Sequence, residues 1–217
     1  MEGFWVDARA FLPLLLRGAV LTVVVTLGAL ALSTVLGLVW ALFRVSQVPV
    51  LTYFSKGVVN TIRGIPILVQ LFYIYFVLPE FGIELTALQA GILGLGIAYS
   101  AYQAENFRAG IEAVDPGQVE AAQSLGMRRS LVLRRVVLPQ AFRIALPPYG
   151  NTMIMMLKDS SQASVITVAE LTQQGRLIAS STFKNTSVFT LVALLYLCMS
   201  VPLILFAGRL ERKFGRK

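Results

Sequence analysis

One long apolar run near the N-terminus limits what this chain can fold into. Residues 14–43 contain a single charged side chain, Arg17. A helix rises ~1.5 Å per residue, so a run of this length reaches about 45 Å, which exceeds the ~30 Å hydrocarbon core of a bilayer. Arg17 lies near the start of the run, where a long side chain can extend its charge to the headgroups. The run therefore predicts a tilted membrane-spanning helix.

The composition favours a membrane protein over a soluble one. Of the 217 residues, 56% are hydrophobic and only 14% are charged, and the mean hydropathy is +0.73. Soluble domains carry about 25% charged residues. The length fits a single domain over residues 1–217. We expect an all-α membrane protein with five transmembrane helices. The expected spans are residues 14–43, 58–78, 86–107, 137–157 and 187–208.

Basic residues flank these apolar runs, which is typical of topology signals rather than of a nucleic-acid surface. The segments 44–63, 108–143 and 209–217 hold fourteen of the nineteen lysines and arginines. With five spans these segments share one side of the membrane, and the positive-inside rule makes that side the cytoplasm. We therefore expect the N-terminus outside, the C-terminus inside and no nucleic-acid partner.

Several kinds of chemistry are excluded by residues that the chain lacks. It has no histidine, so neither a Ser-His-Asp triad nor a histidine metal site can form. Its one cysteine, Cys198, lies in an apolar run and cannot form an internal disulfide. No phosphate loop of the Gly-x-x-x-x-Gly-Lys-Ser/Thr type occurs. We therefore expect no enzyme activity, catalytic residue, metal or cofactor in this chain.

The longest polar segment, residues 113–135, predicts a short capped helix between the third and fourth spans. Asp115 suits the N-cap, Pro116 suits the first helical turn, and Gln118 follows Asp115 by three residues, as in a capping box. Gly126 supplies a left-handed stop. The segment is therefore expected to be a helix with defined ends.

One side of this expected helix is apolar, because Val119, Ala122 and Leu125 recur at helical spacing. Four arginines follow, at positions 128, 129, 134 and 135. A short helix with a small-residue apolar side, held between membrane spans, is suited to enter a groove on a soluble partner. The alternative is a surface helix that has no partner.

The same segment resembles a known sequence pattern. Glu120-Ala121-Ala122, followed by Gly126 and Leu138-Pro139, resembles the EAA loop in the membrane subunits of type I ABC importers. The flanking stretches 100–105 and 138–141 are similar to the polar-amino-acid permease family, whose substrates include histidine, glutamate, glutamine, arginine and opines. The resemblance covers nearly the whole chain.

This resemblance implies a permease that works inside a larger complex. In the family, the loop forms a cytoplasmic coupling helix that docks onto the ATP-binding subunit, so ATP is bound by the partner. The coupling residues carried over are Glu120, Ala121, Ala122, Leu125 and Gly126. The implied partners are two ATP-binding subunits, a second permease (the same chain or a paralogue), a solute-binding protein and an amino acid. The implied location is the bacterial inner membrane.

The end of the fourth span carries the candidate substrate path, the polar patch Lys158–Gln162. Ionisable residues at membrane depth suggest function. Asp159 could pair with the ammonium of an amino acid, while Lys158 and the hydroxyls of Ser160 and Ser161 could bind its carboxylate. The family has a similar Lys-Asp/Asn-Thr/Ser-Ser-Leu stretch, in which Gln162 replaces Leu. The alternative is that Lys158 and Asp159 only end the span at the headgroups.

Gln70, within the second span, is a further candidate for the path. A lone amide in a span is more often an interhelical hydrogen bond than a ligand contact. Four prolines are the candidate hinges: Pro66, Pro139, Pro147 and Pro148. Pro66 belongs to Arg63-Gly64-Ile65-Pro66, which resembles the family's Arg-Gly-Thr-Pro with Ile65 in place of Thr. The adjacent pair Pro147-Pro148 should end or kink the fourth span.

Span three holds small residues, Ala90, Gly94 and Ala98, at a spacing of four. Such residues let helices approach closely in lipid. Packing within the chain is favoured over a dimer contact. Glu105 and Arg108 lie three residues apart near the end of this span and are expected to pair.

Two other functions are compatible with parts of the sequence. The first is a stand-alone secondary transporter or channel for small polar solutes, which often shows inverted repeats and buried carboxylate relays. No repeat is visible, and five spans do not divide evenly. The second is a membrane scaffold without transport, which leaves the polar patch unexplained. An ATP-driven amino-acid importer is the favoured interpretation.

Overall fold

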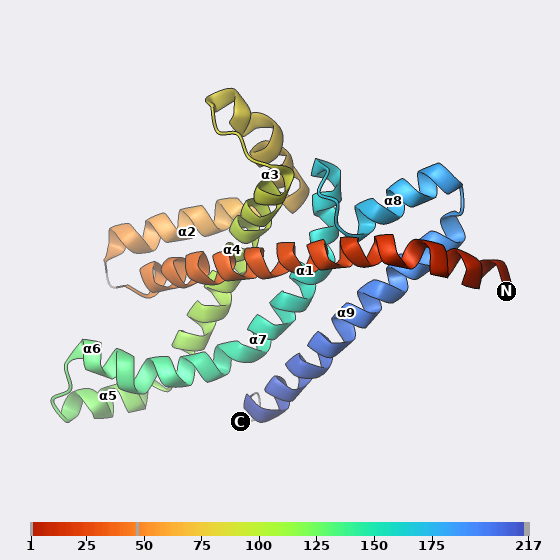
Figure 1. The fold of residues 1–217 in the computed structure, drawn as a ribbon. Helices are drawn as coiled ribbons and strands as arrows, with labels where there is room; N and C mark the ends of the chain where they lie inside the picture. The colour runs from red at the N-terminus through yellow and green to blue at the C-terminus, as the bar shows by residue number, and fades with distance from the viewer. Residues whose placement is uncertain (1, 47, 215–217) are drawn as a thin grey trace.

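The protein, seen in a computed structural model that describes residues 2–46 and 48–214, consists of helices joined by turns (Figure 1). The long helices are α1 (Glu2–Val45), α4 (Ala87–Glu112), α7 (Leu138–Asp159) and α9 (Asn185–Phe214). The shorter α-helices are α2 (Pro49–Gly64), α3 (Ile67–Phe72), α5 (Pro116–Ser124), α6 (Arg129–Val132) and α8 (Leu171–Thr182). Two π-helical segments, η1 (Tyr73–Val77) and η3 (Leu133–Val137), and two 3-10 segments, η2 (Leu78–Phe81) and η4 (Ser160–Ile166), extend them. No strand occurs among the described residues, which confirms the all-α prediction. Arg216 and Lys217 of the basic tail lie outside them.

Small residues let α4 pack closely against its neighbours. A Cβ built on Gly37 of α1 would lie 2.6 Å from the Cβ of Gln103, which is closer than real Cβ contacts, so α1 and α4 meet almost backbone to backbone. Ala90, Gly94 and Ala98 are all buried within the chain. The structure therefore favours packing inside the chain for this small-residue stripe.

The segment expected to be the second span contains a sharp bend at Pro66, one of the candidate hinges. The helical stretches Pro49–Gly64 and Ile67–Phe81 meet at 98°. Ile65 between them is extended, with φ −105° and ψ 129°. A residue before proline is pushed away from the helical region, and proline lacks an N–H for the helix ladder, so Pro66 accounts for the break.

Of the two expectations for Pro147-Pro148, that the pair ends the fourth span or kinks it, the first is wrong. α7 runs without interruption from Leu138 to Asp159, with both prolines inside it. Near the pair, the Thr152 hydroxyl donates to the Pro148 carbonyl over 2.9 Å, and Asn106 of α4 donates to the same hydroxyl over 2.9 Å. Polar side chains thus bond to each other and to the helix backbone beside the prolines, as in other proline-containing membrane helices.

Among the described residues, two helices are each long and apolar enough to cross a membrane, namely α1 and α9. The bent pair α2 and Ile67–Phe81 would make a third span if it crosses as one unit. α4 and α7 have 26 and 22 residues, which is also long enough, but they carry more polar side chains.

The described residues form four apolar clusters, the smallest of which (Val59, Ala101 and Ala104) joins α2 to α4. One cluster joins α1, α3, α4 and η4, and a second joins α1, α8 and α9. The third is small and lies at the other end of α4 and α7, around α5, α6 and η3. We call residues 113–137 the α5–α6 lobe; Figure 1 shows it away from α8.

Candidate functional site

The α5–α6 lobe begins with a helix whose N-terminus is capped as expected. The Asp115 carboxylate accepts a hydrogen bond from the Gly117 N–H over 2.8 Å, and Pro116 occupies the first turn. The expected capping box with Gln118 does not form. The Gln118 side chain instead accepts a 2.6 Å hydrogen bond from the Gln140 amide of α7. That bond joins α5 to the start of α7.

Gly126 ends α5 in the left-handed conformation that its position predicts, with φ 77°. The Met127 N–H donates to the Ala122 carbonyl over 3.2 Å, and the Gly126 N–H donates to the Gln123 carbonyl over 2.9 Å. These two bonds form the Schellman arrangement, which requires φ > 0 at the residue that Gly126 supplies. A Cβ at Gly126 would meet no atom within 4 Å, so the requirement comes from the backbone and not from space.

The lobe separates the residues that were expected on one apolar side. Ala122 is buried in the third cluster, and Val119 packs against it. Leu125 points outward and is 83% exposed, so the three residues do not share one apolar side. Glu120 and Ala121 are exposed as well. Ala121 and the C-cap residue Leu125 are therefore exposed to solvent, Glu120 is exposed beside a neighbouring cavity, and Ala122 anchors the helix.

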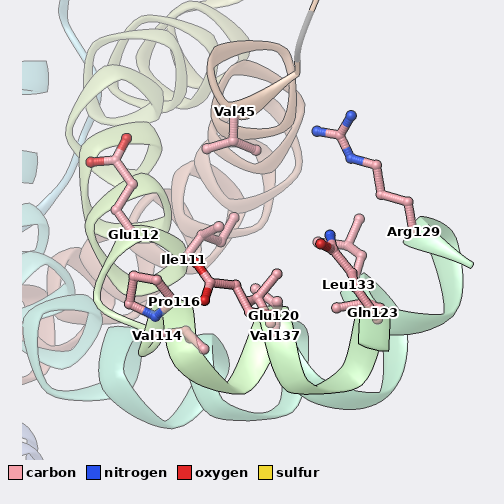
Figure 2. A pocket seen from close by; sticks show the side chains of 12 residues that line it. Val45, Ile111, Glu112, Val114, Pro116, Glu120, Gln123, Arg129, Leu133 and Val137 are labelled. Carbon is pink, nitrogen blue, oxygen red and sulfur yellow. The ribbon is translucent and has the colours of Figure 1, made fainter. Parts of the chain in front are cut away.

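A cavity of about 490 Å³ lies between the lobe and the ends of α1 and α4 (Figure 2). Its floor is apolar, and Val45 of α1 faces it across from α5. Glu120 and Gln123 reach it from α5, and Glu112 from α4. Its remaining lining residues are Ile111, Val114, Pro116, Val119, Arg129, Val132, Leu133 and Val137. The lobe therefore leaves a space beside the ends of α1 and α4.

Charged side chains join the ends of α1 and α4 beside this cavity. The expected pair of Glu105 and Arg108 forms, with 2.7 Å between Oε2 and Nη2. Arg44 of α1 lies 3.3 Å from the other Glu105 oxygen, and Arg108 also pairs with Glu112. The Glu105 carboxylate thus holds the end of α1 against α4.

The second candidate site, the patch Lys158–Gln162, lies at the far end of α7. The Tyr99 hydroxyl of α4 donates to Asp159 Oδ2 over 2.7 Å. Ser160 is buried and donates to the Leu157 carbonyl. Lys158 is exposed, and Ser161 and Gln162 are partly exposed. The structure therefore positions the Asp159 carboxylate and engages the Ser160 hydroxyl in the helix end.

Gln70 lies at the bend between α2 and α3. Its side-chain amide donates to the Ile62 carbonyl over 2.9 Å and to the Ile65 carbonyl over 2.8 Å. Both carbonyls belong to the end of α2, where helical partners are lost. This gives Gln70 a structural role at the Pro66 break.

Sequence reasoning missed two residues. Tyr99 was read as part of an apolar span, although a tyrosine hydroxyl that is buried needs a partner. Glu170 was not singled out, and its side chain is fully buried at the N-cap of α8. No local pattern points to either contact, because the partners are 60 and 26 residues away in sequence.

Glu170 joins α1, α8 and α9. Its carboxylate accepts hydrogen bonds from the Gln173 N–H (2.8 Å), the Thr172 N–H (2.9 Å) and the Tyr196 hydroxyl (2.7 Å). Thr22 of α1 lies 3.4 Å from the same carboxylate, and its hydroxyl accepts from the Leu171 N–H over 3.1 Å. Burial raises the pKa of Glu170, and the hydrogen bonds oppose that rise. We call this set of side chains the Glu170 cluster.

Among the described residues, no group of three or more histidine, cysteine or acidic side chains is placed to hold a metal ion. The geometry offers two candidate binding surfaces: the exposed residues at α5, and the Asp159 carboxylate held by Tyr99 at the far end of α7.

Comparison with known proteins relates the chain to transport. Residues 33–216 match the family model described as binding-protein-dependent transport system inner membrane component. The chain is 37% identical to the probable amino-acid permease protein YxeN of Bacillus subtilis, over 98% of this chain and 96% of that protein. It is 34% identical to the glutamine transport system permease protein GlnP of Escherichia coli, over 98% of both.

The fold has a near match among solved structures. A crystal structure of an amino acid ABC transporter with histidines contains a chain that superimposes with a TM-score of 0.90. The two sequences are 38% identical, and the match covers 96% of this chain and 97% of that chain.

Proposed function

We infer the function from one premise: the chain belongs to the family of binding-protein-dependent transport system inner membrane components. It is the membrane-spanning permease subunit of an ATP-driven amino-acid importer. The observation that carries this conclusion is the full-length similarity in both sequence and fold to amino-acid ABC permeases. The same similarity favours this function over a stand-alone secondary transporter or channel. Because the chain belongs to this family, it is a membrane protein, and in bacteria it is a protein of the inner membrane.

For its topology we propose five crossings with the N-terminus outside. The two apolar helices α1 and α9, the bent pair α2–α3, and α4 and α7 would each cross once. This arrangement puts the α5–α6 lobe, the end of α1 and the C-terminal end of α9 on the same side, where basic residues are concentrated. Labelling of single cysteines introduced into the lobe, from outside and inside sealed vesicles, tests the orientation.

We propose that α5 is the coupling helix, which docks into a groove on the ATP-binding subunit. The exposed Glu120, Ala121 and Leu125 support this role, since they lie at a helix with fixed ends. Gly126 ends the helix, and Ala122 anchors it to the lobe. Two ATP-binding subunits would each take one permease, with the second permease a copy or a paralogue. ATP would be bound by those subunits.

The proposed substrate path includes the patch at the end of α7. The Asp159 carboxylate would bind the ammonium group of the amino acid, and the Tyr99 hydroxyl would hold the Asp159 side chain in position. Lys158, Ser161 and Gln162 would supply the contacts to the carboxylate or side chain of the substrate. The proposal does not extend to Ser160 or Gln70, because both donate hydrogen bonds to backbone carbonyls.

The hinge role proposed for the prolines rests on different local structures. Pro66 lies at a 98° bend, whereas Pro139, Pro147 and Pro148 lie within a continuous helix. We propose that Pro66 fixes a permanent bend. Pro147 and Pro148, inside α7, lower the number of backbone hydrogen bonds that must be broken when that helix flexes, whereas Pro139 lies in its first turn and removes none.

Reconstitution tests the proposed function. The permease is placed in liposomes with and without its ATP-binding subunit, and uptake of radiolabelled amino acids is measured against ATP and against ion gradients. We expect uptake only when the ATP-binding subunit, ATP and a solute-binding protein are all present. Uptake driven by a proton or sodium gradient in the absence of ATP would instead support the secondary-transporter alternative.

A further inference from the structure

An apolar groove lies between α1, α4 and α7, in the half of the molecule that carries the lobe. Two adjoining cavities of about 250 and 260 Å³ form it, and Thr34 of α1 and Phe107 of α4 line both. α7 contributes one stripe of side chains, namely Leu138, Ala141, Phe142, Ala145, Leu146 and Tyr149. We call this space the α1–α7 groove. It lies where α1 and α7 diverge toward the lobe (Figure 1).

The α1–α7 groove is closed at one end and accessible at the other. At the end away from the lobe, the Tyr149 hydroxyl lies 2.9 Å from the Thr34 hydroxyl, so these side chains bridge α7 and α1. The Phe107 ring stacks on the Tyr149 ring, with 6.2 Å between the centroids. Closer to the lobe, Leu38 and Phe142 line the groove and are exposed. A chain-shaped apolar molecule can therefore enter near the lobe and end at the hydroxyl pair.

The length of the α7 stripe matches the depth of one leaflet of a bilayer. From Leu138 to Tyr149 the helix rises ~17 Å at 1.5 Å per residue. Half of a ~30 Å hydrocarbon core is ~15 Å. In the proposed topology the stripe begins at the cytoplasmic side, since Leu138 directly follows the lobe. The groove thus has the length and the position of an acyl chain in the inner leaflet.

Two arginines stand at the lobe end of the α1–α7 groove. Arg134 of η3 precedes Leu138 by four residues, which is the spacing of neighbours on one helix face, and Arg135 follows it directly. Both are exposed, and within residues 2–46 and 48–214 neither forms a salt bridge. Basic side chains beside a pocket between membrane helices on the cytoplasmic side bind anionic lipid headgroups. The charge therefore favours an anionic phospholipid over a neutral one.

The α1–α7 groove faces away from the proposed substrate path. Tyr149 precedes Lys158 in the continuous helix α7 by about two and a half turns, so the two side chains lie on opposite faces of that helix. Lys158 and Asp159 belong to the path, whereas Tyr149 closes the groove. An amino acid on its way through the permease therefore does not occupy this space, and a lipid at the outer face of the bundle can.

We propose that the α1–α7 groove binds an acyl chain of an anionic phospholipid from the inner leaflet, and that Arg134 and Arg135 bind the phosphate of that lipid. The lipid fills the space between α1 and α7 and contacts the α5–α6 lobe through the two arginines. It thereby links the lobe to the long helices at a place where few side chains do so. The proposal rests on the proposed function only for the topology, because the lobe must face the cytoplasm.

The test measures lipid bound to the purified complex of the permease with its ATP-binding subunit. The complex is titrated in detergent with phosphatidylglycerol or with phosphatidylcholine, and bound lipid is counted by mass spectrometry of the intact complex. The wild type should bind one phosphatidylglycerol per permease about tenfold more tightly than phosphatidylcholine. Arg134→Gln/Arg135→Gln should abolish this preference. The matched control, Arg209→Gln/Arg212→Gln, removes the same charge from the exposed end of α9 and should retain the preference.

Leu38→Trp tests the apolar part of the site. Leu38 lines the groove and is exposed, so a larger ring at this position occupies the space of the acyl chain. The variant should bind both lipids about tenfold more weakly. Val35→Trp is the matched control, because Val35 is exposed on the same helix and does not line the groove. It should bind both lipids as the wild type does.

The yield of assembled complex shows whether the variants fold, and the comparison of the two lipids on the wild type needs no variant. Equal affinities of the wild type for the two lipids overturn the proposal, as does a preference that survives the loss of both arginines. Loss of the second permease from Leu38→Trp, with lipid binding unchanged, overturns it in favour of a contact between permeases.

ATP-driven uptake by the same complexes in liposomes tests the proposed function separately. Uptake by a wild type that shows no lipid preference overturns the lipid site and leaves the proposed function intact. Lipid binding as expected, without ATP-driven uptake of any amino acid, contradicts the proposed function and supports the site.

Discussion

The α5–α6 lobe and the Glu170 cluster lie at opposite ends of the molecule and are stabilised differently. The lobe has a small core of valine and alanine side chains, and α5 closes its own ends with Asp115 and Gly126. The Glu170 cluster is a buried carboxylate that joins α1, α8 and α9 through partners far apart in sequence. One end is built locally and presents a helix outward, whereas the other is built from distant parts of the chain.

The difference indicates that the two regions have different roles, one in movement and one in holding the long helices together. A lobe with its own local hydrogen bonds can shift as a unit when a partner moves it, because few bonds to the long helices have to break. The Glu170 cluster fixes three helices together and gives the moving parts a stable frame. Each prediction below tests one side of this comparison, beginning with the largest expected effect.

Glu170→Ala should cause the largest loss of stability. It leaves the Thr172 and Gln173 N–H groups and the Tyr196 hydroxyl without their buried acceptor, which costs about 3 kcal/mol in total. The melting temperature of the detergent-solubilised permease, followed by circular dichroism, should fall by roughly 6–12 °C. Tyr196→Phe, which removes one donor only, should cause a smaller decrease. A melting temperature equal to that of the wild type would mean that the Glu170 cluster does not stabilise the packing of α1, α8 and α9.

Gly126→Leu should uncouple transport from ATP hydrolysis with little effect on melting. A leucine in the left-handed conformation costs about 1–2 kcal/mol, so the end of α5 should change shape. The amino acid transported per ATP hydrolysed should fall about tenfold, as measured by parallel uptake and phosphate release in liposomes. Gly126→Asn is the matched control, because asparagine tolerates this conformation and should retain coupling. Equal transport per ATP in the leucine variant and the wild type would argue against the coupling role.

Asp159→Asn and Tyr99→Phe test the patch that lies between the two ends. Loss of the carboxylate should lower amino-acid uptake, and loss of the tyrosine hydroxyl should raise the KM for uptake about three- to tenfold, because one hydrogen bond contributes ~0.5–1.5 kcal/mol. Assembly with the ATP-binding subunit, measured by copurification, should be unchanged in both. Normal uptake by Asp159→Asn would remove this residue from the substrate path.

Asp7→Asn should have the smallest effect. Asp7 of α1 pairs with the partly exposed Lys184 and accepts a 2.9 Å hydrogen bond from Ser187, beside the start of α9. Ion pairs with exposed partners contribute little, so the melting temperature should move by no more than about 2 °C, and the difference should disappear in high salt. A decrease as large as that of Glu170→Ala would mean that the frame depends on this pair as well.

Local features of the lobe could be read from the sequence because they depend on neighbouring residues. Asp115 as a cap and Gly126 as a left-handed stop are both correct, since each acts within a few residues of its own position. The burial of Ala122, which was expected on the same apolar side as the exposed Leu125, was missed because it depends on how α5 packs on α7. The bond between Gln118 and Gln140 was missed for the same reason.

Long-range features could not be read in this way. The pairing of Tyr99 with Asp159 joins two helices, and Glu170 bonds to α1 across 148 residues. The Pro147-Pro148 pair was expected to end or kink a helix, because proline removes backbone hydrogen bonds. The helix nevertheless continues through both prolines. α4 packs along it, and Asn106 of α4 donates a hydrogen bond to the Thr152 hydroxyl. Contacts between helices, and not the preferences of neighbouring residues, thus determine these three features.

The right-angle turn at Pro66 has a consequence for reading related sequences. Two carbonyls, from Ile62 and Ile65, depend on a single amide, that of Gln70, to replace their missing helical donors. A side chain without two N–H donors cannot serve both, so glutamate, leucine or methionine cannot substitute without a second change. A relative that keeps the proline but lacks glutamine at this position must recruit another donor, or a water molecule, at the same corner. The proline and the glutamine are thus best compared between sequences as a pair.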